Sequence, residues 1–202
     1  MIAIPWYFTG ILHQEGLFGR IYFLVTAVSL FWGVYAGALI DRYDRRKLFL
    51  AMNVAGLLIL GGTAAYGFYN EGLDWWMAAI PFAATAFIYN IHFPNLYAFA
   101  QEITSKENYA KVNSLLEIQG QISFTLAGGI AAILLNGLDG SGYSIGDLSL
   151  LKGFIVKPWT IYEIFLVDAL TYIVALVIIY FIKTMPVVEK QIDTAPLRER
   201  LK

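Results

Sequence analysis

Long apolar runs separated by short polar connectors form the dominant pattern of the chain. A hydrocarbon core of about 30 Å is crossed by about 20 helical residues at about 1.5 Å each, and each main run reaches that length. The runs lack the wide polar face of soluble amphipathic helices, and the Gly and Pro inside them are tolerated in membrane helices. The pattern predicts five membrane-spanning helices, at about 20–40, 48–69, 77–101, 112–135 and 160–182.

The stretch 1–12 is apolar too, but it is too short to span a membrane. It offers about 18 Å of helix before the polar residues His13, Gln14 and Glu15. A natural start at Met1 would place a charged amine near mid-membrane, where a central charge costs at least about 2.5 kcal/mol. We therefore expect the back half of a first helix. A signal peptide is the alternative, although a basic n-region and a small-residue cleavage site are missing.

Composition supports the membrane interpretation and removes several other classes of protein. Hydrophobic residues make up 58% of the 202 positions and charged residues 14%, with a mean hydropathy of +0.62, whereas soluble domains carry about a quarter charged residues. A net charge of −1 makes nucleic acid an unexpected partner. The chain has no cysteine and two histidines, which excludes thiol chemistry and a multi-histidine metal site. We expect no metal, no cofactor and membrane lipid as the surroundings.

The charges between the helices separate by side. When 1–12 is counted as the first of six helices, most Lys and Arg residues fall on the side of a dense basic connector between the second and third helices. Its cations are Arg42, Arg45, Arg46 and Lys47. Because such residues resist translocation, this side is expected to be cytoplasmic. Acidic residues and interfacial tryptophans mark the loops 70–76 and 136–159 on the other side. The sequence thus predicts a multi-pass inner-membrane protein with both termini in the cytoplasm.

The basic connector also carries a family resemblance. The run from Gly37 to Lys47 resembles the G-x-L-x-D-R-x-G-R-R signature between helices two and three of the major facilitator superfamily. The matching residues are Gly37, Leu39, Asp41, Arg42, Arg45 and Arg46. Asp44 stands where glycine is usual, and an acidic residue there is common in the branch of drug and siderophore exporters. Pro94, Glu102, Asn113 and the run 167–172 resemble the same branch.

This resemblance implies an all-α fold and a function. Superfamily members usually have twelve helices in two six-helix halves, so we expect residues 1–185 to form the N-terminal half, with a truncated first helix. Residues 186–202 would begin the central cytoplasmic loop, and the C-terminal half would be the missing partner. The implied activity is secondary active export of a small organic solute by alternating access, driven by an ion gradient. The alternative is a six-helix scaffold or assembly partner that does not transport. An enzyme is not expected, because no plausible catalytic set is present.

The connector residues Gly37, Asp41, Arg42, Asp44, Arg45 and Arg46 are the candidate gating set. The resemblance implies that Asp41 pairs with Arg45 or with a helix of the other half, which would bias the gate between two states. Gly33 and Gly37 lie four residues apart on one helix face and would allow a neighbouring helix to approach closely. The simpler alternative is that the cations only fix topology and the glycines only pack helices. Gly128 and Gly129 on the fifth helix are further candidates for helix packing.

Polar residues inside the apolar runs are the candidates for a coupling or substrate path. On the fifth helix, Asn113, Glu117, Gln121 and Thr125 recur at four-residue steps, and we expect this face to look into the bundle. An ionisable residue within a membrane helix is a functional hypothesis by default, so Glu117 is a candidate proton carrier. The alternative is that Glu117, close to the cytoplasmic end, is solvated or paired with a cation.

Two further helices supply candidates of the same kind. Asp168 has no cation within four residues of it in sequence and is either a second proton carrier or a hydrogen-bonding group between helices. The fourth helix contains Asn90 and His92 but no arginine, although many family members carry one around this part of the helix. His92, which titrates near physiological pH in water, is a possible substitute in coupling, with a packing role as the alternative. The solute itself is not readable from the sequence.

Overall fold

The computed structural model describes residues 2–140, 143–145, 148–150 and 153–182. The helices are α1 (Ala3–Trp6), the π-helix η1 (Tyr7–Ile11), α2 (Glu15–Arg42), α3 (Arg45–Tyr69), α4 (Trp75–Glu102), the 3-10 helix η2 (Lys106–Asn108), α5 (Tyr109–Asn136) and α6 (Ile161–Phe181). The helices α2 to α6 are long and apolar enough to cross a membrane. The all-α membrane fold is confirmed, while the predicted loop start at 186–202 lies outside the described residues.

The observed helices extend past several of the predicted limits. The prediction for α2 began at about 20, but the helix begins at Glu15; α5 begins at Tyr109 and ends at Asn136. Polar residues beyond the hydrocarbon core continue the helices, and an apolar pattern alone cannot detect those turns. The stretch 1–12 is not one regular helix, because α1 passes directly into η1, where the Leu12 N–H bonds to the Tyr7 carbonyl at 2.9 Å.

The long loop between α5 and α6 contains short strands that composition did not reveal. The strands are β1 (Leu138–Asp139), β2 (Tyr143–Ile145), β3 (Leu148–Leu150) and β4 (Ile155–Val156). β1 pairs antiparallel with β4, and β2 pairs antiparallel with β3. The β1–β4 ladder joins the two ends of the loop, with Leu138 opposite Val156, and so ties the end of α5 to the segment before α6.

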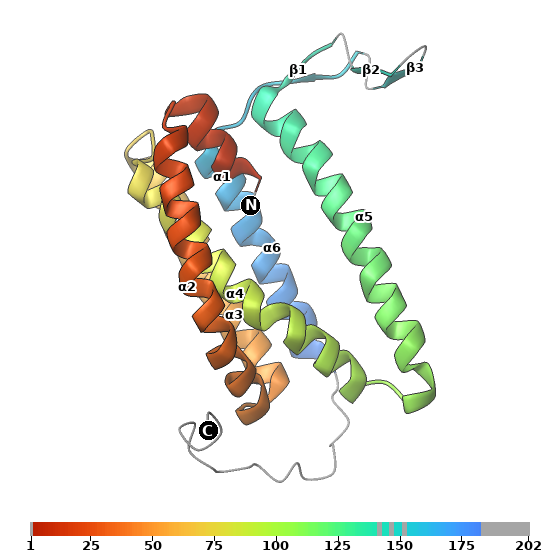
Figure 1. Cartoon of the computed structure of the whole chain (residues 1–202). Coiled ribbons are helices and arrows are strands. Elements are labelled where there is room, and N and C mark those ends of the chain that lie inside the picture. Colours follow the sequence, from red (N-terminus) through yellow and green to blue (C-terminus); the bar gives the residue numbers. More distant parts are fainter. Residues whose placement is uncertain (1, 141–142, 146–147, 151–152, 183–202) are drawn as a thin grey trace.

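The helices run back and forth between two ends of the bundle, which we name by their loops. The connector end holds residues 43–44 between α2 and α3, and the opposite end holds the loop 70–74 and the described residues between α5 and α6. Figure 1 shows α2, α3, α4 and α6 side by side, with α5 standing apart over most of its length. Among the described residues of α5, only Leu135 is buried. The expected six-helix bundle is therefore an inner group with one splayed helix.

Close packing between α3 and α6 depends on two glycines. Gly56 receives the ring of Tyr172, and Gly67 receives the side chain of Tyr162. A methyl group built on Gly67 would lie 2.5 Å from the Tyr162 Cβ, closer than real Cβ atoms approach other atoms. Since lipid tails are as apolar as the side chains, such close van der Waals packing is a main source of helix association in membranes. The sequence analysis singled out other glycines.

Candidate functional site

Asp44 defines how α3 begins at the basic connector. Its side chain accepts a hydrogen bond from the Lys47 N–H at 2.8 Å, which caps the first turn of α3. Aspartate is among the preferred N-cap residues because its oxygen satisfies a helix N–H that has no partner within the helix. The acidic residue at the position of the usual glycine therefore has a local structural role in starting the helix.

Arg45 and Arg46 fasten the connector to other helices. The Arg45 guanidinium pairs with the Glu102 carboxylate at 2.8 Å and donates to the Ala98 carbonyl at 2.6 Å. The fully buried Asn95 donates its side-chain N–H to the Arg45 carbonyl at 3.0 Å. Arg46 donates to the Tyr180 carbonyl on α6. The start of α3 is thus bound to both α4 and α6.

The Arg45–Glu102 pair replaces one of the pairings left open by the sequence. Asp41 and Arg42 are exposed, and the Asp41 side chain has no hydrogen bond or ion pair within the described residues, so it does not pair with Arg45. A Cβ built on Gly37 meets nothing within 4 Å, whereas one built on Gly33 lies 3.9 Å from the Asn90 Oδ1. The surface of α2 around Gly37 and Asp41 is open, and their roles in gating and packing stay predictions.

A second candidate site is a cavity of about 200 Å³ between α3, α4 and α6. It brings together two residues that the sequence analysis named separately, His92 on α4 and Asp168 on α6. The other polar lining residues are Asn53, Tyr89, Thr171 and Tyr172. The His92 ring packs edge-on against the Phe49 ring, with centroids 5.5 Å apart. An imidazole and a carboxylate on one cavity form a set of groups able to accept and release protons.

Local hydrogen bonds orient the groups around this cavity. The Thr171 hydroxyl donates to the Asp168 carbonyl at 2.7 Å and lies 3.5 Å from its carboxylate Oδ1. Asn53 donates to the Phe49 carbonyl one turn earlier at 2.8 Å, so its amide oxygen stays available to the cavity. The sequence analysis did not name Asn53, Tyr89, Thr171 or Tyr172 as site residues. Asn53 carried a readable signal, as a polar residue within an apolar run.

The remaining candidates do not join the cavity. Glu117 accepts a hydrogen bond from the Tyr97 hydroxyl at 2.7 Å, so it faces α4, while Gln121 is exposed. Asn90 donates to the Ala86 carbonyl within α4 at 2.9 Å and approaches α2. Further along α5, a Cβ added to Gly128 would lie 3.7 Å from the Ile2 side chain, whereas one added to Gly129 would have no neighbour within 4 Å. Glu117, Gln121 and Thr125 are all exposed, so the expectation that this face of α5 looks into the bundle is met only by the contact of Glu117 with Tyr97.

Comparison with known proteins identifies the family. The family model described as Major Facilitator Superfamily matches residues 1–201, which is nearly the whole chain. No curated protein and no solved structure matches the chain. Members of this family are transporters rather than enzymes. The long apolar helices and the matched family together establish that the chain is a multi-pass membrane protein that belongs to the Major Facilitator Superfamily and has the fold of its transporters.

Proposed function

We propose that this chain is the N-terminal half of an exporter that moves a small organic solute by alternating access, driven by an ion gradient. The connector end lies in the cytoplasm of a cell whose inner membrane holds the protein, with both termini on that side. The distribution of described cations supports this orientation, since Lys and Arg are retained on the cytoplasmic side. The connector end carries Arg42, Arg45, Arg46, Lys47, Lys106 and Lys111, against Arg20 and Lys157 at the opposite end.

The observation that carries the proposal is that the connector is bound on one side and open on the other. Arg45 and Arg46 hold α3 against α4 and α6, while Asp41 and Gly37 lie on the open surface of α2. A complementary six-helix half packs on this surface, and Asp41 contacts it in one of two conformations. A contact that is made in just one of the two states shifts the equilibrium between them, and alternating access requires such a shift.

The cavity between α3, α4 and α6 supplies the coupling groups. Asp168 carries the proton, and His92 on the same cavity exchanges it or stabilises the charged carboxylate. A charge near mid-membrane costs at least about 2.5 kcal/mol on insertion scales, so protonation changes which arrangement of α4 and α6 is favoured. Glu117 is the second candidate for proton carriage, through its hydrogen bond with Tyr97.

The test is solute-driven proton movement in proteoliposomes that contain the complete transporter. A pH-sensitive dye inside the vesicles reports proton flux when members of a panel of amphipathic organic solutes are added. We expect Asp168→Asn to abolish solute-dependent flux and Glu117→Gln to change its pH profile less. Glu107→Gln, an exposed acid in η2, is the matched control and keeps the wild-type profile.

The outcomes separate the hypotheses. Unchanged pH profiles in both Asp168→Asn and Glu117→Gln would remove these residues as coupling groups. A folded complete protein that moves no solute of the panel, while still assembling with a partner, would favour the scaffold alternative. Transport without any proton flux would point to another coupling ion.

A further inference from the structure

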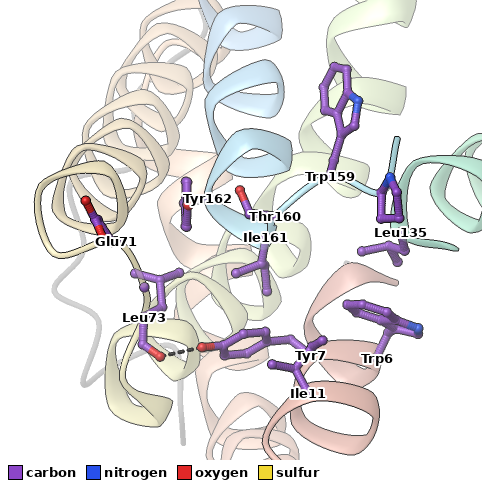
Figure 2. Close-up of a pocket in the computed structure, with 12 residues that line it drawn as sticks. Trp6, Tyr7, Ile11, Glu71, Leu73, Leu135, Trp159, Thr160, Ile161 and Tyr162 are labelled. Carbon is purple, nitrogen blue, oxygen red and sulfur yellow. Dashed lines mark hydrogen bonds between the residues drawn. The ribbon is translucent and has the colours of Figure 1, made fainter. Parts of the chain in front are cut away.

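A second cavity, of about 320 Å³, lies at the opposite end of the bundle. Five parts of the chain meet there: the α1–η1 segment, the loop between α3 and α4, the end of α5, the segment 158–160 and the start of α6. Figure 2 shows Trp6 and Glu71 on opposite sides of this region, with Ile161 between them. The cavity is separate from the one that holds His92 and Asp168, and none of its residues was singled out as a candidate site from the sequence.

Hydrogen bonds hold the walls of this cavity in place. The Tyr7 hydroxyl donates to the Leu73 carbonyl and so joins η1 to the loop between α3 and α4, as Figure 2 shows. The backbone N–H of Trp159 donates to the Leu134 carbonyl at 2.7 Å, which fastens the segment before α6 to the end of α5. At the start of α6, the Thr160 N–H and hydroxyl both donate to Glu163, at 2.6 and 2.8 Å. These bonds fix Tyr7 and the segment 159–160 against the neighbouring elements.

Two uncommon backbone conformations occur in the wall. Tyr7 and Ile11 belong to the π-helix η1, and π-helical turns are rare and frequently found at functional sites. Glu71 has a positive φ of 52° directly after the C-cap of α3, where the Gly72 N–H bonds to the Gly67 carbonyl at 3.1 Å, so this conformation belongs to the end of the helix. Both conformations present side chains to the same cavity.

The lining chemistry selects for positive charge on an apolar body. Trp6, Tyr7, Trp159 and Tyr162 supply aromatic rings, and Glu71 supplies a carboxylate that has no hydrogen bond or ion pair within the described residues. The lining contains no Lys, Arg or His. Aromatic faces attract cations through the ring quadrupole, most strongly for Trp, and the carboxylate adds direct attraction.

We propose that this cavity binds an amphipathic organic cation. The ammonium group lies at the Glu71 and Tyr162 side, and the apolar body extends along Ile161 towards Trp6 and Leu135. The charges around the cavity favour the same ligand. Within the described part of the chain, two acidic residues, Asp74 and Glu163, flank the lining, and one basic residue, Lys157, does so. The same chemistry recognises a free solute or the quaternary ammonium of a choline headgroup, and the experiment separates these sources.

The test measures binding to the full-length protein, purified in nanodiscs of phosphatidylglycerol, by saturation-transfer NMR. Benzyltrimethylammonium is the probe, and the anion phenylacetate is the comparison ligand of similar size. We expect saturable binding of the cation only. Glu71→Gln should weaken it about fivefold and reduce its salt dependence, and Trp6→Leu should weaken it about fivefold. The matched controls Glu107→Gln, at the connector end, and Trp75→Leu, outside the lining, should keep the wild-type affinity.

Several results would overturn this assignment: equal binding of phenylacetate, unchanged affinity in both Glu71→Gln and Trp6→Leu, or equal weakening in the two controls. Repeating the titration in phosphatidylcholine nanodiscs identifies the source of the ligand. Loss of probe binding there assigns the cavity to a choline headgroup, and retained binding assigns it to a free solute. The assay measures ligand binding and does not require transport. Failure of proton coupling through Asp168 would therefore not affect the binding result, and absence of binding would not contradict the coupling proposal.

Discussion

Replacing Gly67 by alanine tests whether the contact between α3 and α6 is as close as the structure shows. The added methyl group would lie 2.5 Å from the Tyr162 Cβ and 2.8 Å from its Cγ. The Cβ is fixed to the α6 backbone and cannot move aside by side-chain rotation, so the two helices must separate by about 1 Å, the kind of backbone shift that overpacking forces. Overpacking of this kind costs typically about 1–3 kcal/mol.

The other glycines of α3 provide graded controls for this change. At Gly56 the added methyl meets the ring of Tyr172, which can rotate towards the 200 Å³ cavity, so we expect a smaller cost. At Gly62 nothing lies within 4 Å, so alanine meets open space there. In soluble helices alanine is favoured over glycine by about 0.8–1.0 kcal/mol. Gly62→Ala should therefore be neutral or slightly stabilising.

Thermal unfolding in detergent, followed by intrinsic fluorescence, measures these differences. For a domain of this size a loss of 1 kcal/mol lowers Tm by about 2–4 °C, so Gly67→Ala should lower it by about 2–12 °C. Tyr172→Leu should relieve the cost of Gly56→Ala, because the clash there is with the ring. Tyr162→Leu should not relieve Gly67→Ala, because leucine keeps the Cβ. A Tm for Gly67→Ala equal to that of Gly62→Ala would refute the close contact.

Three further outcomes follow from the connector. Asp44→Ala should destabilise the start of α3 by about 1 kcal/mol and Asp44→Ser should restore most of it, which thermal unfolding would measure; equal stability of the two variants would exclude the cap. Asp41→Asn should slow transport by the complete protein while its membrane level stays near normal, and a matching loss of protein would show a folding role instead. Glu102→Gln weakens the ion pair with Arg45, and Arg45→Lys removes the guanidinium N–H groups that form it. Both changes should shift the accessibility of the connector end to a membrane-impermeant label. Unchanged labelling would count against a structural role of this pair.

The apolar runs predicted the spanning helices because a membrane imposes a minimum length on each of them. The same reasoning could not choose between glycines. Gly33 and Gly37 have the expected spacing, but the tight contacts occur at Gly56 and Gly67, since the position of α6 decides which helix face needs small residues. Small residues are visible in a sequence, whereas the neighbour that requires them is a property of the fold.

The candidate site was predictable residue by residue but not as an assembly. His92 and Asp168 were identified as polar groups in apolar runs, yet their meeting on one cavity depends on how α4 and α6 lie against α3. The pairing of Arg45 with Glu102 was missed for the same reason, although both residues occur at the same predicted membrane side. The aromatic cavity escaped prediction because its lining comes from five separate parts of the chain.

The isolation of α5 has a mechanical consequence. The helix is attached near its two ends, through Tyr97 and Glu117 at one and the β1–β4 ladder at the other. Because only Leu135 is buried among the described residues of α5, little side-chain packing resists turning of the helix about its axis. The exposed Ile118 and Ile122 lie about 100° around the helix axis from Glu117 and Gln121, so a roll of that size exchanges a polar stripe for an apolar one and breaks the hydrogen bond between Tyr97 and Glu117. The Tyr97–Glu117 hydrogen bond is therefore the contact that fixes which of these stripes faces the space beside α4.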